Sequence, residues 1–400
     1  MKIISVVGAR PNFMKIAPFI REIECYNQSI SPSRTHTLTP SSKKEPVNHI
    51  LVHTGQHYDD RMSKTFFQEL AIPEADINLG VGSGTHAEQV GQTMIEFEKV
   101  LKIEKPDWVV VLGDVNAILA CSVTAKKENI KCCHIEAGLR SGDMAMPEEI
   151  NRLVADRLSD LLLTPDLISS ENLRKEGVTE DKIRFVGNIM IDTLEANREK
   201  AAKLRTEKII DENLVKKTGT SGVRRQASGE YAVMTLHRPS NVDNRDILEP
   251  IVRFVTEEIC AERTLIWTLH PRTRKMLESF HLFHELDKVE NLVLLEPLSY
   301  LEMLKLNMEA RVMLTDSGGL QEECTILGTP CLTLRWNTER PVTLAEHGGA
   351  SVLVGNNIDR IRKEYHSALL KPRNPVRPQS WDGHTAERCL QALLDYDLKK

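Results

Sequence analysis

The sequence lacks three features that would each restrict its function: a long hydrophobic run, an excess of one charge and a paired-cysteine motif. No apolar stretch is long enough to span a bilayer, and the apolar N-terminal run is too short for a signal peptide. The chain has 52 Lys and Arg against 57 Asp and Glu, a net charge of −5, so no overall basic field attracts nucleic acid or a membrane surface. We therefore expect a cytoplasmic protein without a nucleic-acid or membrane partner, in which local groups bind any anionic ligand.

The eight cysteines are scattered and mostly lie among apolar residues. No CxxC pair is present, and Cys132 and Cys133 are adjacent on a predicted buried strand. This usage is typical of small buried thiols in a reducing compartment, and a metal site is not predicted.

A chain of 400 residues is too long for one small core and suits two domains of ordinary size. Strand-length apolar runs alternate with helical patterns in both halves, which is typical of parallel sheets covered by helices on both faces. The predicted fold class is therefore α/β, with two Rossmann-like, doubly wound domains. We place the first domain at residues 1–187 and the second at 188–380. We expect an amphipathic helix within 381–400 to pack back on the first domain.

The predicted strands fall into two series. The first consists of Lys2–Gly8, His49–His53, Trp108–Gly113, Lys131–Glu136, Leu161–Thr164 and Arg184–Gly187. The second consists of Ala232–Leu236, Thr264–Leu269, Val293–Leu295, Val312–Thr315, Cys331–Leu334 and Ser351–Val354. A polar stretch ending in Thr218–Gly229 separates them as a linker and exposed loop. The second series does not open with the glycine fingerprint of dinucleotide-binding domains, so an NAD cofactor is not indicated.

The stretch Val312–Gly328 predicts a phosphate site. An apolar strand ends at Thr315-Asp316, and Ser317, Gly318 and Gly319 then open a helix that Gly328 closes. A helix that begins on small residues presents backbone N–H groups and the positive end of its dipole, which suit a phosphate or diphosphate. An ordinary strand-to-helix turn is the alternative interpretation. The pair Glu322-Glu323 inside the helix and Arg340 beyond the next strand favour a nucleotide ligand.

Polar residues that follow the predicted strands are the candidates for chemistry, because ligands of parallel sheets bind beyond the carboxyl ends of the strands. The first domain offers Arg10, Lys15, Asp114, Glu136, Glu148 and Arg152, and the second offers His237 and His270 beside the phosphate turn. The combination indicates a cleft in which carboxylates face a diphosphate site. Carboxylates in such a low-dielectric site can act as general acid or base, which suits removal of a proton from carbon while a nucleoside diphosphate leaves.

Each candidate also has a purely structural alternative. Asp114 can serve as a helix N-cap, and Glu148 suits the first turn of a helix through the dipole alone. His237 and His270 can be hydrogen-bonded structural histidines. Glu136 is harder to explain structurally, because a carboxylate at the end of an apolar strand is costly unless it is exposed in a cleft or paired.

The whole chain closely resembles the non-hydrolysing UDP-N-acetylglucosamine 2-epimerases. The matching motifs occur in the order of the family from the N-terminus to the last helix. They are GARPNFMK (Gly8–Lys15), HTGQH (His53–His57), LGD (Leu112–Asp114), HIEAGLRSGD (His134–Asp143), PEEINR (Pro147–Arg152), VGN (Val186–Asn188), LHRPSNVDN (Leu236–Asn244), DSGGLQEE (Asp316–Glu323) and TERP (Thr338–Pro341).

The resemblance implies a glycosyltransferase-B arrangement of the two domains, with the active site in the cleft between them, and a homodimer. It also implies reversible inversion at C2 of the sugar in UDP-N-acetylglucosamine. UDP leaves with the C2 proton to give 2-acetamidoglucal, and then adds back after reprotonation from the other face. No cofactor is implied.

The resemblance also implies residue roles. Asp114, Glu136 and Glu148 match the catalytic carboxylates of the family, His237 its active-site histidine, and Lys15 and Arg152 the groups that stabilise charge. Arg10, His270, Ser317, Gly318, Gly319, Glu323 and Arg340 match positions that bind the UDP-sugar, Glu323 through the ribose. Which carboxylate removes the C2 proton stays open.

Some motifs depart from the bacterial pattern. Bacterial enzymes that their own substrate activates carry a glutamine at the position of Asp59, so allosteric activation is not expected here. The stretches around His53–Asp60, Leu236–Asn244 and His270–Lys275 are more similar to a branch that includes archaeal enzymes and epimerases of diacetamido-uronates. Another UDP-2-acetamido sugar as substrate, a hydrolysing epimerase, a retaining glycosyltransferase and an inactive UDP-sugar-binding protein are the alternatives.

Overall fold

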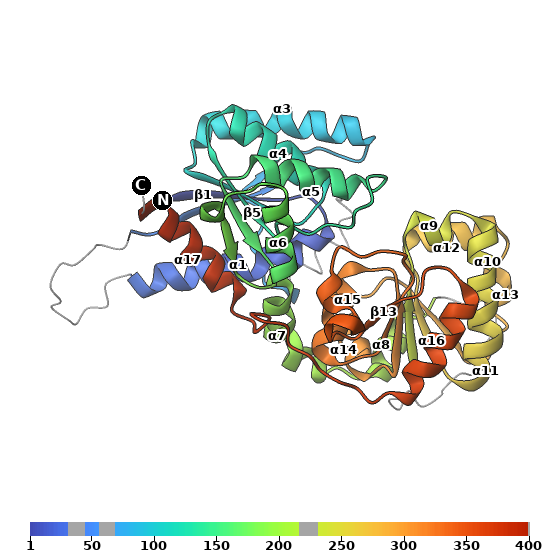
Figure 1. The fold of residues 1–400 in the computed structure, drawn as a ribbon. Coiled ribbons are helices and arrows are strands. Elements are labelled where there is room, and N and C mark those ends of the chain that lie inside the picture. Colours follow the sequence, from blue (N-terminus) through green and yellow to red (C-terminus); the bar gives the residue numbers. More distant parts are fainter. Residues whose placement is uncertain (31–44, 56–68, 216–230, 399–400) are drawn as a thin grey trace. The chain divides into compact units, whose positions relative to one another are not determined.

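The computed structural model describes residues 1–30, 45–55, 69–215 and 231–398. The chain forms two compact units: unit 1 comprises Met1–Thr193 and Gln379–Lys400, and unit 2 comprises Leu194–Pro378 (Figure 1). The chain passes from unit 1 to unit 2 inside one helix, α7 (Ile189–Ala202). The sequence features at Gln56, His57, Asp59 and 218–229 lie outside the described residues, as does the side chain of Arg10.

Unit 1 is built on a parallel sheet whose order in the described part of the chain is β3-β2-β1-β4-β5-β6-β7. Its strands are β1 (Lys2–Val7), β2 (Asn48–His53), β3 (Ile77–Asn78), β4 (Trp108–Leu112), β5 (Lys131–Ile135), β6 (Leu161–Thr164) and β7 (Ile183–Phe185). Its helices are α1 (Arg10–Ile30), α3 (His86–Glu104), α4 (Asn116–Lys127), α5 (Pro147–Leu158), α6 (Leu167–Lys175), η1 (Glu180–Lys182), α7 and α17 (Thr385–Leu398).

Two helical layers bury this sheet. Helices α3, α4 and α5 pack in a row on one face, and α1 packs with α17 on the other (Figure 1). The central strand β4 is therefore buried along its whole length, which explains its uninterrupted apolar sequence. The ring of Trp108 at the start of β4 packs edge-on against Tyr396 of α17, with the ring centroids 5.0 Å apart.

Unit 2 repeats the same plan, with the parallel order β10-β9-β8-β11-β12-β13 among its described residues. Its strands are β8 (Ala232–Thr235), β9 (Leu265–Thr268), β10 (Leu292–Leu295), β11 (Val312–Thr315), β12 (Cys331–Thr333) and β13 (Ser351–Leu353). Its helices are α8 (Thr206–Asn213), α9 (Pro239–Val242), α10 (Arg245–Arg253), the π-helical η2 (Phe254–Ile259), α11 (Cys260–Glu262), α12 (Pro271–Ser279), α13 (Phe283–Leu286), α14 (Tyr300–Glu309), α15 (Gly318–Leu327), η3 (Pro341–Thr343), η4 (Ala345–His347) and α16 (Ile358–Leu370).

The strand order places the functional edge of each sheet. The order reverses direction between β1 and β4 in unit 1 and between β8 and β11 in unit 2. Ligands of doubly wound sheets bind outside the carboxyl ends of the strands at such a switch point.

The predicted fold class, α/β with two Rossmann-like doubly wound parts, is confirmed. Strand β3 was not predicted, because two residues are too few to give a periodic signal. Among the described residues, no helix combines the length and the apolarity needed to cross a membrane.

The C-terminal segment is anchored to unit 1 by buried polar contacts. The indole Nε1 of Trp381, which is 1% exposed, donates a hydrogen bond of 2.9 Å to the carbonyl oxygen of Pro165. The carboxylate of Asp192 accepts hydrogen bonds from the backbone N–H groups of Thr385 (3.1 Å) and Ala386 (2.7 Å) and so caps α17. Burial raises the pKa of Asp192.

Asp316 ties the ends of the two neighbouring strands β11 and β8 together. Its buried carboxylate accepts hydrogen bonds from the backbone N–H groups of His237 (3.0 Å) and Arg238 (2.9 Å) and from the Asn241 amide (3.0 Å). It also lies 2.8 Å from Nδ1 of His237. Burial by itself raises the pKa of Asp316, but His237 beside it and the backbone N–H donors outweigh burial and lower it to about 2.

We predict that Trp381→Ala lowers the free energy of unfolding of unit 1 by about 3–5 kcal/mol, because it removes a large buried side chain and leaves a cavity. Trp381→Phe keeps most of the volume and loses the hydrogen bond to Pro165, so it should cost about 1–3 kcal/mol. Urea unfolding measures both values. Leu370→Ala, at a side chain that is 87% exposed, is the control and should stay within about 0.5 kcal/mol of wild type. An unchanged unfolding midpoint in Trp381→Ala contradicts the anchor.

We predict that the free energy of unfolding falls at acid pH because Asp316 becomes protonated. Because the folded state lowers the pKa of this carboxyl to about 2, its contribution is fully present above about pH 4 and is lost as the pH falls towards 2. The expected contribution is about 2 kcal/mol. Unfolding measured from pH 6 to pH 2 should therefore show a steeper loss in wild type than in Asp316→Asn. The exposed Asp359→Asn is the matched control and should retain the wild-type slope.

Candidate active site

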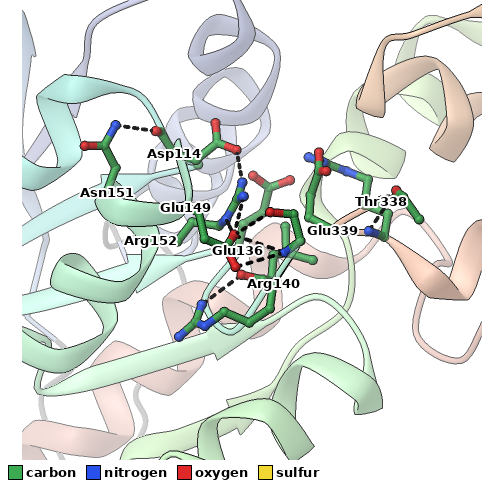
Figure 2. Close-up of polar contacts among 12 residues, drawn as sticks. Asp114, Glu136, Arg140, Glu149, Asn151, Arg152, Thr338 and Glu339 are labelled. Atoms are coloured by element: carbon green, nitrogen blue, oxygen red, sulfur yellow. Dashed lines mark hydrogen bonds and ion pairs between the residues drawn. The ribbon is translucent and has the colours of Figure 1, made fainter. Parts of the chain in front are cut away.

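The candidate residues of unit 1 gather at the carboxyl ends of β1, β4 and β5. Lys15 lies on α1, Asp114 directly follows the β4 turn, and Glu136 follows β5. Arg152 lies on α5, whose first turn also carries Glu148. Figure 2 shows Asp114, Glu136 and Arg152 close together at this edge of the sheet.

Glu136 is paired and held in an unusual backbone conformation. Its φ of 73° lies in the left-handed region, which costs a non-glycine residue about 1 kcal/mol or more. Both its N–H group and that of Ala137 donate to the carbonyl oxygen of Leu163, at 3.1 Å each, and so hold this sharp turn. The turn directs the carboxylate to the ammonium group of Lys15, and both side chains are almost fully buried. The ion pair with Lys15 thus offsets the desolvation free energy of a carboxylate at the end of an apolar strand.

Gly113 makes room for this pair. Its φ is 77°, and an added Cβ atom would lie 2.9 Å from Nζ of Lys15 and 3.5 Å from Oε2 of Glu136. Any side chain at this position would therefore displace Lys15 from the carboxylate. The glycine of the LGD motif is required by the ion pair as much as by the turn.

Asp114 is joined to α5 through Arg152. The guanidinium of Arg152, which is 1% exposed, lies 2.6 Å from the Asp114 carboxylate through Nη1 and 2.6 Å from Glu149 through Nη2 (Figure 2). Asn151 donates a hydrogen bond of 2.9 Å to the backbone carbonyl of Asp114. Side chain and backbone of Asp114 are therefore both fixed, while 23% of its side chain stays exposed.

Of the adjacent acids Glu148 and Glu149, Glu149 is the one that binds the neighbouring loop and Arg152. Its carboxylate accepts hydrogen bonds from the backbone N–H groups of Ser141 (3.0 Å) and Gly142 (2.9 Å) as well as from Arg152. Burial raises the pKa of Glu149, and these donors outweigh burial and lower it overall. Consecutive side chains on a helix point about 100° apart, so the partly exposed Glu148 points elsewhere.

The candidate residues of unit 2 gather at the N-terminus of α15. Ser317 is the N-cap residue, and Gly318 and Gly319 form the first turn. An added Cβ atom at Gly318 would lie 2.6 Å from Nη1 of Arg340 and 2.9 Å from Oε1 of Glu339. The Arg340 guanidinium thus packs directly against the helix start, where it adds positive charge to the dipole end.

Arg340 is held by two buried glutamates. Its Nε atom donates to Oε1 of Glu322 at 2.6 Å, and its Nη1 atom donates to Glu339. Arg335 binds the other oxygen of Glu339 at 2.6 Å, and the backbone N–H of Arg340 donates to the Thr338 hydroxyl oxygen at 3.1 Å. The guanidinium is therefore fixed in position before any ligand binds.

Glu323 is enclosed beside this group. Burial raises the pKa of its carboxyl to about 7, and the neighbouring Glu322 adds to the shift, while Tyr300 and Asn307 oppose it. The same environment raises the pKa of the Tyr300 hydroxyl. A carboxyl that changes charge near neutral pH can either donate or accept a hydrogen bond.

His237 and His270 lie side by side at the ends of β8 and β9, with their ring centroids 5.5 Å apart. Nδ1 of His237 is directed at Asp316, and 37% of its side chain is exposed. His270 is the exposed N-cap residue of α12 and accepts a hydrogen bond of 3.2 Å from the backbone N–H of Arg272 through Nδ1. Each histidine thus has a structural contact and a surface that a ligand can reach.

The structure brings the predicted residues together in two groups. Lys15, Asp114, Glu136, Arg152 and the neighbouring Glu148 form the group in unit 1. His237, His270, Ser317, Gly318, Gly319, Glu323 and Arg340 lie along one edge of the sheet in unit 2. No group of side chains in the described ranges is arranged to hold a metal ion.

Several residues support the site in a way that was not predicted from the sequence. They are Glu149, Asp316, Arg335, Glu339 and the buried pair His134 and Asp156. The sequence contained one usable signal, the adjacent acids in PEEINR, since two neighbouring helical residues cannot face the same partner. The other contacts join residues that are far apart in the chain or lie within an irregular loop, where no periodic pattern marks them.

Comparison with known proteins supports the resemblance found in the sequence. The family model for UDP-N-acetylglucosamine 2-epimerase matches residues 41–394. A UDP-N-acetylglucosamine 2-epimerase of Methanocaldococcus jannaschii is 41% identical over 394 residues, which cover 98% of this chain and 99% of the relative. A UDP-2,3-diacetamido-2,3-dideoxy-D-glucuronate 2-epimerase of Pseudomonas aeruginosa is 35% identical over 375 residues, which cover 93% of each chain.

Solved structures agree with these sequence matches. The crystal structure of the Methanocaldococcus jannaschii enzyme in complex with UDP-GlcNAc and UDP superposes with a TM-score of 0.85 at 40% identity, covering 99% of this chain and 100% of that one. The lipopolysaccharide outer core galactosyltransferase WaaB matches with a TM-score of 0.50 at 14% identity over 100% and 99% of the chains, a likeness of fold alone. The architecture is thus that of glycosyltransferase-B proteins, and the chain belongs to the UDP-N-acetylglucosamine 2-epimerase family.

Proposed function

We propose that this protein is a UDP-N-acetylglucosamine 2-epimerase that interconverts UDP-N-acetylglucosamine and UDP-N-acetylmannosamine. The observation that carries the proposal is the group of Asp114, Glu136, Lys15 and Arg152, in which each acid is paired with a buried cation. The related archaeal enzyme, whose structure contains UDP-GlcNAc and UDP, supports the choice of substrate.

The proposed reaction is an elimination followed by an addition. A carboxylate accepts the C2 proton, the C2–H electrons form the C1–C2 double bond, and UDP leaves with the electron pair of the C1–O bond. The product is 2-acetamidoglucal. In the return step a carboxylic acid protonates C2 on the other face, and a UDP oxygen attacks C1. Reaction on two faces requires acids on both sides of the ring, and we assign this work to Asp114, Glu136 and Glu148 without fixing their order. The reaction is redox-neutral overall, so no nicotinamide cofactor is needed.

Two cations of unit 1 pair with two of these carboxylates. Lys15 beside Glu136 and Arg152 beside Asp114 hold the two carboxylates in place and bring positive charge to the site. When the C2 proton moves to a carboxylate, the freed cation can stabilise the negative charge that develops on the substrate.

Unit 2 supplies the site for the leaving group. We propose that the diphosphate binds at Ser317, Gly318 and Gly319, where N–H groups at the start of α15 and the Arg340 guanidinium favour negative charge. A donor set fixed in advance stabilises the leaving UDP without reorganisation. The Glu323 carboxyl binds the ribose, and Arg10, His237 and His270 contact the rest of the UDP-sugar.

A second candidate substrate follows from the relatives. The 35% identity with the Pseudomonas aeruginosa diacetamido-glucuronate enzyme is spread over 93% of the chain, so the proposed chemistry also suits a UDP-2-acetamido-uronate. The acids that act on C2 serve both sugars, and only groups near C3 and C6 distinguish them.

We also propose that the enzyme works as a homodimer in the cytoplasm and supplies UDP-N-acetylmannosamine for a surface polysaccharide. All eight cysteines are free thiols, which suits a reducing compartment. The net charge of −5 gives no attraction to nucleic acid or to anionic membranes.

The proposed function predicts a specific outcome for UDP-GlcNAc incubated with the enzyme in deuterated water. Proton NMR should show UDP-ManNAc accumulating, with deuterium at C2 of both epimers, because each elimination releases the C2 proton to solvent. Free ManNAc with UDP indicates a hydrolysing enzyme. The absence of C2 exchange contradicts an epimerase and points to a transferase or a binding protein. The same assay with the UDP-diacetamido-uronate gives kcat/KM for the second sugar, so that the two substrates can be compared.

Variants should separate chemistry from nucleotide binding. Glu136→Gln removes a proton acceptor and should lower kcat by about 10³-fold with the Kd of UDP changed by less than about threefold. Arg340→Ala should raise the Kd of UDP by about 10²-fold, because it removes a fixed cation and leaves two buried glutamates without it. Calorimetric titration with UDP and steady-state kinetics measure both effects.

Arg362→Ala is the matched control for these variants. Arg362 is partly exposed and pairs with Glu258 and Asp359 on the surface of unit 2. Its removal should change neither kcat nor the Kd of UDP. Wild-type turnover in Glu136→Gln contradicts its role in proton transfer, and wild-type UDP affinity in Arg340→Ala contradicts the phosphate site.

A further inference from the structure

A buried network lies behind the turn that presents Asp114. His134 in β5 is fully buried, and its Nδ1 atom is 2.6 Å from Oδ1 of Asp156. Its Nε2 atom is 2.8 Å from the backbone carbonyl oxygen of Gly113. Asp156 on α5 also accepts hydrogen bonds from the backbone N–H of Gly138 (3.0 Å) and from Nη1 of Arg140 (2.7 Å).

Hydrogen-bond geometry decides how the His134 ring is protonated. A carbonyl oxygen can only accept, so Nε2 carries a hydrogen. Asp156 is a carboxylate, since the Arg140 guanidinium pairs with its Oδ2 atom and the backbone N–H of Gly138 donates to the same atom. Oδ1 therefore also accepts, and Nδ1 must carry a hydrogen as well. Both ring nitrogens thus face acceptors, which is the arrangement of a doubly protonated ring.

The network adds a further contact between α5 and the turn that carries Asp114. Asn151 binds the Asp114 carbonyl and Arg152 binds its carboxylate, both directly from α5. Asp156, on the same helix, reaches the preceding carbonyl, that of Gly113, through His134. The turn that carries Asp114 is thus fixed at three successive points, and His134 supplies the one that has no direct link to the helix.

We propose that His134 is a positioning residue for the epimerisation, which as an imidazolium holds the Gly113–Asp114 peptide in the orientation that aims the Asp114 carboxylate at the substrate. This proposal rests on the proposed function for its kinetic consequence. The hydrogen bonds of the His134 ring go to Asp156 and to the Gly113 carbonyl oxygen, and His134 acts on the Asp114 turn through that carbonyl. A displacement of a reacting group by about 1 Å can cost about 10²-fold in rate, so the effect belongs in kcat.

The first test measures the ring itself and needs no substrate. In protein labelled with ¹⁵N-histidine, NMR at pH 7.5 should show one histidine with hydrogen on both nitrogens, whose signals disappear in His134→Gln. A single protonated nitrogen on His134 overturns the proposal. This readout stands even if the enzyme fails to epimerise any UDP-sugar, a result that would overturn the proposed function instead.

The second test separates the two contacts of the ring. The amide nitrogen of glutamine reaches the place of Nε2, so His134→Gln keeps a donor for the Gly113 carbonyl. The amide nitrogen of asparagine reaches the place of Nδ1, so His134→Asn keeps only the contact with Asp156. We expect kcat to fall less than about fivefold in His134→Gln and about 10²-fold in His134→Asn, with KM and the Kd of UDP changed less than about twofold.

A purely structural role predicts a different pattern. If His134 only stabilised unit 1, both variants would lower the melting midpoint and retain kcat per folded molecule. Melting curves and UDP titrations on the same preparations identify the folded fraction. Equal loss of kcat in both variants, or no loss in either, overturns the proposal, whereas a larger loss in His134→Asn confirms the link through Gly113.

Discussion

The need to pair buried charge governs the functional edge of both sheets. A carboxylate or guanidinium that leaves water is destabilising by several kcal/mol unless a partner of opposite charge and good geometry lies within reach. In unit 1, Lys15 pairs with Glu136, and Arg152 joins Asp114 to Glu149. In unit 2, Arg340 lies between Glu322 and Glu339. Lys15–Glu136, Arg152–Asp114 and Arg340–Glu322 join different elements, so the contacts that stabilise these charges also fix the loops that follow the strands.

Such pairs are a poor way to gain stability. Replacing a buried ion pair by well-packed apolar residues is often neutral or stabilising, so the fold by itself does not need them. Their position supplies the reason for their presence: they lie where ligands of doubly wound sheets bind, and the backbone there is strained at Glu136, whose φ is 73°. A donor set fixed before the substrate arrives needs no reorganisation when charge develops, which is the property that a site for an eliminated diphosphate requires.

The sequence predicts the parts of this arrangement that depend on local pattern. Uninterrupted apolar strands such as Trp108–Leu112 predicted a doubly wound sheet, and the residues directly after them, Asp114 and Glu136, could be identified because strand ends are also ligand sites. The choice of partner could not be predicted. Lys15 and Glu136 are separated by 121 positions, and which of Glu148 and Glu149 faces inward depends on the rotation of α5. Asp316 looked like the end of a strand, although its carboxylate holds the loop after β8 through contacts that no local pattern records.

The likeness to WaaB shows what the fold alone can and cannot specify. That galactosyltransferase shares the two-part architecture at 14% identity, so the architecture does not distinguish transfer to an acceptor from epimerisation. A helix N-terminus with an arginine beside it stabilises a departing nucleoside diphosphate in either reaction. The difference must therefore come from the groups that face the sugar carbon. A transferase needs an acceptor hydroxyl at C1, whereas an epimerase needs acids that reach C2 from both faces. We propose the paired carboxylates of unit 1, Asp114 and Glu136, for this second requirement, and for this reason the proposed function depends on them more than on the phosphate site.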